Sequence, residues 1–122
     1  MPSYIQRHTD TCLLIDLAAV VSNWRYLNSI SKVSTKTSAV VKADGYGLGA
    51  NEISVILAGV GCNIFFVACL GEAILLRQHL DNAGYNYSHI MTLNGCQIGQ
   101  EEDHVKSRIT PVLNDLEQLS RW

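Results

Sequence analysis

A lysine followed directly by a glycine-rich run is the segment of this chain best suited to chemistry. Lys42 ends a short β-branched run, and residues 43–49 contain three glycines at alternate positions. In a parallel α/β protein, a lysine in this place lies at the carboxyl end of a strand, the edge at which such folds carry their active sites. An amine among apolar neighbours is costly to keep charged, so it becomes a usable nucleophile or base. The pattern indicates Schiff-base chemistry with a carbonyl cofactor such as pyridoxal phosphate.

The glycines after Lys42 predict a loop that binds a ligand. Gly45, Gly47 and Gly49 let the backbone approach a bound molecule closely. Glycine-rich turns between a strand and a helix also present backbone N–H groups, and they often receive phosphate. We therefore expect residues 43–49 to lie against the cofactor.

Composition restricts the function classes. The chain has 122 residues, of which 48% are apolar, so it is long enough for one modest domain with a core. The net charge of −2 gives no reason to propose nucleic acid or an anionic membrane as a partner. The amino terminus lacks the layout of a secretion signal, and no apolar run approaches the roughly 20 residues that span a bilayer. We predict a cytoplasmic protein without a nucleic-acid or membrane partner.

The four cysteines and four histidines show no metal-binding spacing. The sequence has no C-x-x-C pair, and three of the cysteines lie in apolar surroundings. We therefore predict no metal site, and we expect the thiols to be buried and reduced. The cysteines are Cys12, Cys62, Cys69 and Cys96.

Hydrophobic periodicity predicts alternating strands and helices. After an extended segment at 11–17, Asp16 is the expected N-cap of an amphipathic helix at 17–30. Asn51 is expected to cap a second helix, and Asp115 a last one. The other predicted helices span 72–83 and 98–107, and the predicted strands span 37–42, 64–70, 89–93 and 109–113.

The order of these elements predicts an α/β fold with a parallel sheet. Strand-loop-helix units repeat about four times, at intervals of roughly 20–27 residues. A flavodoxin-like open sheet, which typically has five strands, and part of a (β/α)8 barrel, about 250 residues when complete, both fit this spacing. The sequence stops inside an amphipathic helix, which favours a chain from which a part has been removed.

Residues 40–49, Val-Val-Lys-Ala-Asp-Gly-Tyr-Gly-Leu-Gly, strongly resemble the pyridoxal-phosphate attachment motif of the alanine racemase family. Weaker matches follow in the family's order, so the resemblance covers residues from about 11 to 122. They are Leu14–Leu17 with Asn23, Val67 to Arg77, Ile90–Gly95, and Pro111 to Leu119.

The resemblance implies a role for particular residues. Lys42 would carry the internal aldimine and would be one of two catalytic bases, acting on the side of the D-enantiomer. Tyr46 would place its phenol on the cofactor phosphate, and Val40 and Leu93 match positions that line the cofactor. The implied fold is about four of the eight βα units of a TIM-like barrel, from a longer two-domain protein that works as a homodimer. Residues 1–15 would pack on the missing carboxyl-terminal β domain, and residues 16–122 would form the first half of the barrel.

Two differences from the family are visible within the motif. Family members commonly have alanine where this chain has Gly45, and histidine where it has Leu48. The second base of the family is a tyrosine from the partner subunit's carboxyl-terminal domain, and the arginine facing the pyridine nitrogen lies on a late barrel strand. Neither region is present in these 122 residues, so we expect the chain alone to be inactive.

The resemblance predicts a pyridoxal-phosphate-dependent racemase that interconverts L-alanine and D-alanine by two bases. A non-catalytic barrel protein that binds pyridoxal phosphate and regulates its supply is the alternative, although such proteins usually lack the Tyr-Gly-x-Gly run that follows Lys42. A decarboxylase of the same barrel family is disfavoured by the same loop, and a truncated product without a function of its own is the last possibility. The sequence does not distinguish a role in cell-wall precursor synthesis from one in D-alanine breakdown.

Overall fold

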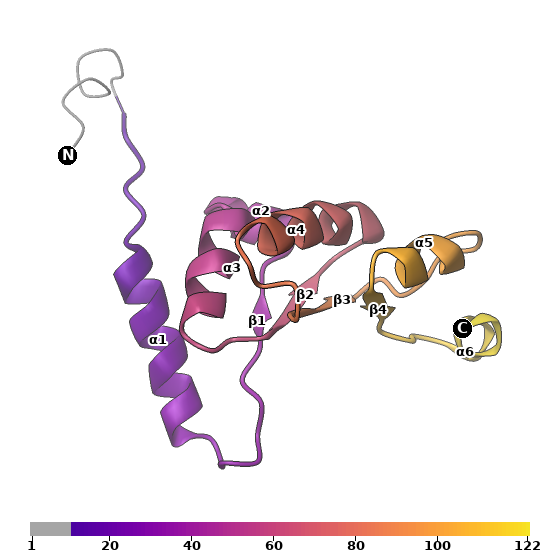
Figure 1. Cartoon of the computed structure of the whole chain (residues 1–122), viewed down its shortest axis with the longest axis horizontal. Helices are drawn as coiled ribbons and strands as arrows, with labels where there is room; N and C mark the ends of the chain where they lie inside the picture. Colours follow the sequence, from indigo (N-terminus) through magenta and orange to yellow (C-terminus); the bar gives the residue numbers. More distant parts are fainter. Residues whose placement is uncertain (1–10) are drawn as a thin grey trace.

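The computed structural model describes residues 11–122, which form a single row of strands flanked by helices (Figure 1). All four predicted strands are present in this part of the chain, and each is shorter than predicted. The strands are β1 (Ala39–Val40), β2 (Ile64–Val67), β3 (His89–Thr92) and β4 (Ile109–Pro111). The helices are α1 (Leu17–Ile30), α2 (Lys42–Gly47), α3 (Ala50–Gly59), α4 (Leu70–Asn82), α5 (Glu101–Lys106) and α6 (Leu116–Arg121).

The four strands form one parallel sheet in the order β1-β2-β3-β4. Each strand therefore pairs with the next strand along the chain. An open flavodoxin-like sheet would place its second strand outside its first, whereas a (β/α)8 barrel keeps its strands in chain order. The order confirms the barrel prediction, with four of the eight strands present.

Helices cover one face of the sheet. Figure 1 shows α4 and α5 above the row of strands and no helix below β2 and β3. Phe65, Val67 and Ile90 face the helices and are fully buried. Val40 of β1 pairs with Phe66 of β2, so both residues point to the other face of the sheet. Val40 is 43% exposed there. Parallel sheets are normally covered on both faces, so the uncovered face corresponds to the interior of a barrel that these strands do not close.

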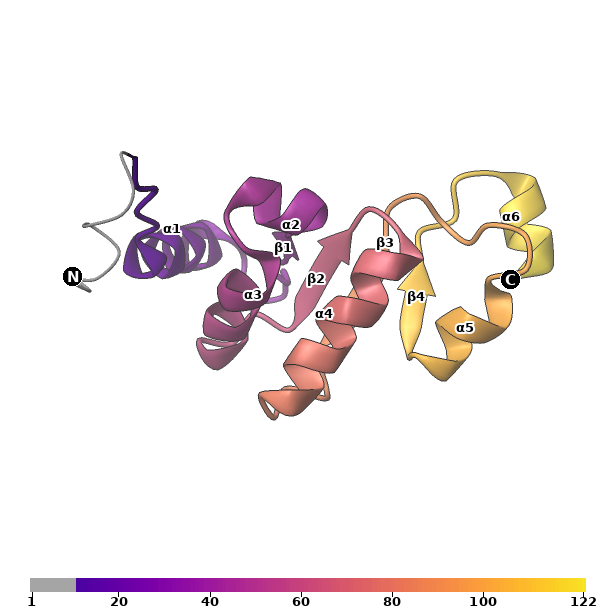
Figure 2. The same cartoon turned by 90° about the horizontal axis from the view of Figure 1, so that it is seen from above.

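The core lies between β2, β3 and the helices α3 and α4. Leu76 and Leu80 of α4 are fully buried against the strands. Figure 2 shows α4 lying alongside β2 and β3, with α3 and α5 on either side of it. Helix α1 has no fully buried residue and packs on this core through Leu17, Val21 and Trp24. The carboxyl ends of the parallel strands therefore lie together at one edge of the sheet, and the covering helices support them.

The helix starts test the capping predictions. Asp16 caps α1 by accepting a hydrogen bond from the Ala19 N–H at 3.0 Å, as predicted. Asp115 likewise caps α6, with 2.7 Å to the Gln118 N–H. The prediction for Asn51 was wrong, because Asn51 is the second residue of α3 and Gly49 is the N-cap.

Arg77 of α4 is buried although its side chain is charged. Its Nη2 donates hydrogen bonds to the carbonyl oxygens of Ser88, at 2.7 Å, and Arg108, at 3.2 Å. Both carbonyls lie just before strands, so the guanidinium satisfies acceptors at the amino ends of β3 and β4. Arg77 therefore stabilises the edge of the sheet opposite to Lys42.

The cysteine prediction is half right. Cys62 and Cys96 are buried, and burial raises the pKa of each thiol above the usual range of a cysteine. Cys12 and Cys69 are exposed, because Cys12 precedes the first helix and Cys69 lies at the start of α4. No disulfide joins the four cysteines, all of which lie in the described range.

The leading segment is described only in part. Residues 1–10 lie outside the described residues. Residues 11–16 carry no regular secondary structure, and Leu13 and Leu14 are each 72% exposed. Packing of this segment on a second domain stays a prediction.

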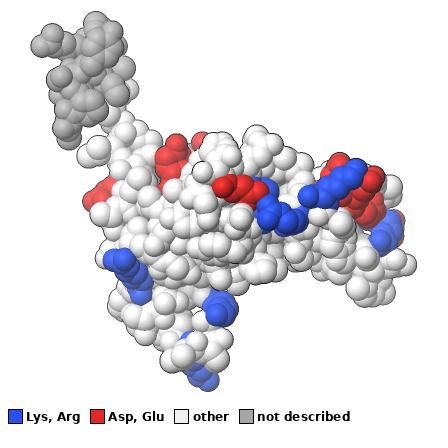
Figure 3. Space-filling model, in the orientation of Figure 1, with Lys and Arg blue, Asp and Glu red and all other residues white. Residues whose placement is uncertain are grey.

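Charges are distributed in small groups of both signs over the face in Figure 3. This distribution agrees with the net charge of −2 and with the absence of a basic stripe from that face.

Within residues 11–122, no helix has the length and apolar character needed to cross a bilayer. The same residues contain no group of three His, Cys, Asp or Glu side chains placed to hold a metal ion.

Gly95 provides a test of the packing at the carboxyl edge. Its φ is +75°, and a Cβ there would lie 2.0 Å from Oε1 of the buried Gln118. The Gln118 amide would have to move and lose its 3.2 Å hydrogen bond from the Asn114 N–H. We expect Gly95→Ala to lower the free energy of unfolding by roughly 2–3 kcal/mol, from backbone strain and the lost hydrogen bond. Urea denaturation measures this change.

Gly61→Ala is the matched control for Gly95→Ala. Gly61 also has a positive φ, +103°, but a Cβ there meets no atom within 4 Å. It isolates the backbone strain, so it should cost about 1 kcal/mol less than Gly95→Ala. Equal losses in the two variants would contradict the packing of Gln118 on Gly95.

Candidate active site

Lys42 lies at the carboxyl edge of the sheet, two residues after the end of β1. Its side chain is half-buried, so the predicted enclosure by apolar neighbours is only partial. Among residues 11–122, no carboxylate oxygen lies within 4.0 Å of its amine. The amine is therefore free to react with a molecule bound at this edge.

The backbone after Lys42 forms a turn of left-handed helix. Residues 43–46 have φ between 51° and 62° and ψ between 35° and 50°. Residues with side chains adopt this conformation rarely and usually singly, at a cost of about 1–2 kcal/mol each. Three of these four residues, Ala43, Asp44 and Tyr46, are not glycine. The sequence predicted a loop here but not its handedness, and such concentrated strain is typical of functional sites.

Hydrogen bonds within the segment hold the left-handed turn closed. The Gly45 N–H donates to the Val41 carbonyl at 2.9 Å, and the Gly49 N–H to the Asp44 carbonyl at 2.9 Å. The Asp44 carboxylate accepts the Ala50 N–H at 2.9 Å and so caps α3. Asp44 therefore stabilises the junction between the turn and α3.

Gly45 lies deepest in the turn and is buried against α3. Its φ is +62°, and a Cβ at this position would lie 3.2 Å from the Ala50 nitrogen. Glycine therefore allows both the left-handed conformation and the close approach of the turn to α3. Leu48, the other difference from the family motif, is 40% exposed at the end of the turn.

Glu72 joins the turn to the neighbouring strand. Its Oε1 accepts the Ala43 N–H at 2.8 Å, and its Oε2 accepts the Ala68 N–H at 2.7 Å. Sequence reasoning did not predict this contact. The position of Glu72 in the first turn of α4 signals capping of its own helix, but nothing local signals a partner 29 residues away.

The other predicted site residues lie around Lys42 at the same edge or face. Val40 lies on the uncovered face of β1 and is partly exposed. Leu93 follows β3 directly and is half-buried, with its N–H bonded to the Val67 carbonyl at 2.8 Å. Tyr46 is 63% exposed in the left-handed turn. Tyr46 is the last residue of the left-handed run and follows Lys42 by four positions.

The loops after β3 and β4 are also joined at this edge. The Asn114 side chain donates to the Leu93 carbonyl at 2.9 Å and to the Val112 carbonyl at 3.2 Å. Asn94 is exposed, and its N–H bonds the Ala68 carbonyl at 2.9 Å. The Gly95 N–H donates to the Thr92 carbonyl at 3.2 Å, so residues 92–95 form a turn.

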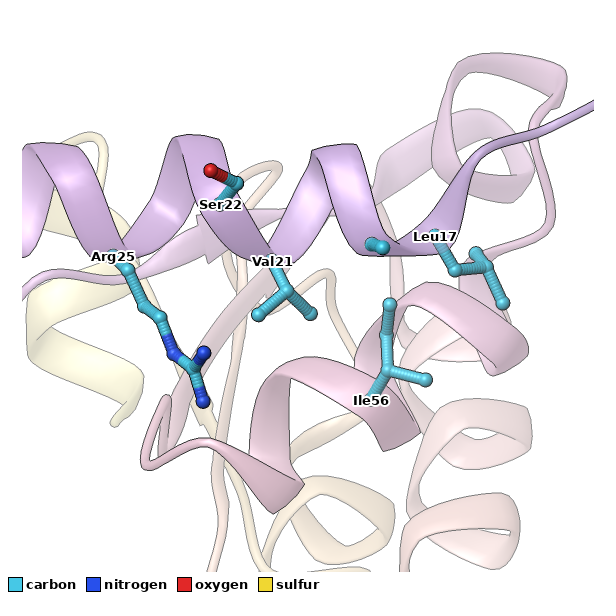
Figure 4. Close-up of a pocket in the computed structure, with 6 residues that line it drawn as sticks. Leu17, Val21, Ser22, Arg25 and Ile56 are labelled. Atoms are coloured by element: carbon cyan, nitrogen blue, oxygen red, sulfur yellow. The ribbon is translucent and has the colours of Figure 1, made fainter.

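Cavities lie near the turn and near the first helix. One of about 290 Å³ lies behind the turn, on the side of the covering helices, and is lined by Val41, Val67, Glu72 and Leu76 among others. Another, of about 420 Å³, is an open groove between α1 and α3 (Figure 4). Figure 4 shows Arg25 at one end of this groove and Leu17 at the other. The groove shares no residue with the Lys42 turn, so it is not part of the candidate site.

The fold and this edge together define the class of the protein. It is a (β/α)-barrel protein that carries a free lysine at the carboxyl end of its first barrel strand, in a strained glycine-containing turn. The comparisons with known proteins agree with this class. The family described as "Alanine racemase, N-terminal domain" matches residues 15–122, so the chain belongs to the alanine racemase family through this domain.

Individual relatives show the same likeness over a limited length. The catabolic alanine racemase of Agrobacterium fabrum is 46% identical over 110 residues, which are 90% of this chain and 27% of that protein. The alanine racemase of Brucella ovis is 44% identical over 110 residues, 90% of this chain and 26% of its own. The chain thus spans about a quarter of the length of these relatives.

Solved structures confirm the fold. Alanine racemase from Bartonella henselae, determined with covalently bound pyridoxal phosphate, matches with a TM-score of 0.78 and 39% identity. The match covers 88% of this chain and 30% of that one. Alanine racemase from E. faecalis matches with a TM-score of 0.77 and 30% identity, over 88% of this chain and 28% of that one.

The capping bond of Asp44 can be tested by mutation. Asp44→Ala removes the acceptor of the Ala50 N–H, so we expect a loss of about 1 kcal/mol in the free energy of unfolding. Hydrogen exchange at the Ala50 amide should become faster at the same time. Asp44→Asn keeps a side-chain oxygen and tolerates the left-handed conformation, so it should lie within about 0.5 kcal/mol of the original chain. Unchanged Ala50 exchange in Asp44→Ala would contradict the cap.

Proposed function

We propose that this chain carries the cofactor-attachment site of a pyridoxal-phosphate-dependent alanine racemase, with Lys42 as the attachment residue. The observation that carries the proposal is the position of Lys42, a half-buried amine without a carboxylate partner among residues 11–122, at the carboxyl edge of a barrel sheet. Membership of the alanine racemase family supports it. The covalently bound pyridoxal phosphate of the Bartonella henselae relative supports the choice of cofactor.

The residues at this edge fit the cofactor. The primary amine of Lys42 can condense with an aldehyde, and the uncovered sheet face beside it carries the partly exposed Val40, Phe66 and Met91. An apolar surface of this kind suits the flat face of an aromatic ring. The exposed phenol of Tyr46 is available to donate a hydrogen bond to the phosphate, and Leu93 lines the cofactor from the end of β3. When bound, pyridoxal phosphate acts as an electron sink that allows the substrate α-carbon to lose its proton.

Inversion at the α-carbon needs one proton-transfer group on each face of the substrate. In this proposal the Lys42 amine holds the proton on the side of the D-enantiomer. The second base is a tyrosine of a partner subunit's carboxyl-terminal domain, which lies outside these 122 residues. The proposal therefore includes a homodimeric, cytoplasmic protein whose substrates are L-alanine and D-alanine.

Attachment of the cofactor tests the role of Lys42 directly. The chain mixed with pyridoxal phosphate should develop an absorbance band near about 420 nm, which is typical of a lysine-bound cofactor. Borohydride reduction followed by peptide mass mapping should place the label on Lys42. Lys42→Ala should lose both the band and the label, because no other amine occupies this edge of the described structure.

Lys32→Ala is the control, since Lys32 is exposed in the segment that connects α1 to β1. It should keep the band at the original intensity. A band of unchanged intensity in Lys42→Ala would remove Lys42 from the site and overturn the proposed function.

Racemisation by the chain alone tests the two-base requirement. We expect turnover of alanine to be negligible even with added cofactor, because only one of the two bases belongs to these residues. The measurement is the change in optical rotation of L-alanine, or coupling to a D-amino-acid oxidase. Robust turnover by material free of host racemase would show that a second base is present in the chain.

A further inference from the structure

The Glu72 carboxylate contacts two backbone amides that belong to different strand ends. Oε1 accepts the N–H of Ala43, the residue after Lys42, and Oε2 accepts the N–H of Ala68, the residue after β2. The two distances are 2.8 and 2.7 Å. Hydrogen bonds to an ionised acceptor are roughly twice as strong as neutral ones. A single side chain thus fixes the ends of two adjacent strands relative to each other.

Helix capping accounts for only one of these contacts. Glu72 is the third residue of α4, and a glutamate there commonly reaches back to a backbone N–H near the helix start. The bond to Ala68 is of this kind. The bond to Ala43 is not, because Ala43 lies 29 residues earlier in a different loop. Capping of α4 does not require it.

The Ala43 contact lies at the start of the left-handed turn. Ala43 has φ 51°, and it is the first of the strained residues that follow Lys42. The bonds within the turn use the N–H groups of Gly45, Leu48 and Gly49, so the Ala43 N–H depends on Glu72 for an acceptor. This bond fixes the backbone directly after Lys42, and it therefore sets the direction in which the Lys42 side chain leaves the sheet.

Side-chain packing does not replace the Glu72 bond. The cavity of about 290 Å³ beside the turn is lined by Glu72 together with Asp44 and Val41. Side chains therefore do not completely fill the space between the turn and α4. Loss of the carboxylate would leave the turn free to shift toward the cavity.

We propose that Glu72 is a positioning residue for the Lys42 amine. The proposal rests on the proposed function, because it concerns the attachment of pyridoxal phosphate to Lys42. Glu72 touches neither cofactor nor substrate in this role. It acts through the Ala43 amide, by holding the turn in the conformation from which Lys42 reaches the cofactor aldehyde.

The Glu72→Asp variant distinguishes the positioning of Lys42 from the capping of α4. Glu72→Asp keeps the negative charge at the start of α4 but is one methylene too short to reach both amides. Its urea midpoint should fall only by the loss of the Ala43 bond, because an acid remains in the first turn of α4. Attachment of pyridoxal phosphate, followed as growth of the band near about 420 nm, should slow about 10- to 100-fold, as expected for a misplaced reacting group. Hydrogen exchange at the Ala43 amide should become faster.

Glu52→Asp is the matched control, because Glu52 is the third residue of α3 as Glu72 is of α4. Within the described residues its carboxylate bonds no strand end, so neither the attachment rate nor Ala43 exchange should change. Glu72→Ala should slow attachment at least as much as Glu72→Asp, and circular dichroism checks that both are folded.

The outcomes separate the two proposals. Attachment at the original rate in Glu72→Asp or Glu72→Ala overturns the positioning role and leaves the proposed function intact. Failure of the unmodified chain to attach the cofactor overturns the proposed function and the positioning role with it. Slowed attachment and faster Ala43 exchange in both Glu72 variants, with Glu52→Asp unchanged, support the positioning role.

Discussion

The placement of the Lys42 amine depends on one turn of left-handed backbone that local forces alone would not favour. Four successive residues occupy the left-handed region, and the three that carry side chains cost on the order of 3–6 kcal/mol together. Hydrogen bonds to the carboxylates of Glu72 and Asp44 offset this cost, since each such bond contributes about 1–3 kcal/mol. The turn is thus stable only in the context of α3, α4 and β2, and the reactive residue is fixed by elements far from it in sequence.

The two faces of the sheet differ in burial, since one forms the core and the other stays accessible. Phe65, Ile90 and the α4 leucines bury one face and supply the hydrophobic stabilisation of the domain. The other face carries Val40, Phe66 and Met91, which remain accessible beside Lys42. The same period-2 alternation that gives each strand a buried side therefore also gives it a side available to a cofactor.

The sequence predicted the fold well because its signals were local. Asp16 and Asp115 cap helices as expected, and the strand-loop-helix spacing gave the parallel sheet. The family motif identified Lys42, but the backbone geometry of the turn that follows it was not predictable. Residues 42–47 show no sequence feature that dictates a run of left-handed non-glycine residues, and the Glu72 to Ala43 bond joins parts of the chain that only the fold brings together. Asn51 was misplaced because Asp44, from within the turn, supplies the capping oxygen of α3.

The chain-order pairing of the strands has a consequence for how such a protein is made. Each strand pairs with its predecessor along the chain, so no pairing in this sheet depends on a strand later than the next one. On a ribosome, which releases the amino terminus first, β1 and β2 with α4 would complete the lysine turn while later segments are still being translated. The Lys42 amine would then be in place before α5, β4 and α6 have emerged.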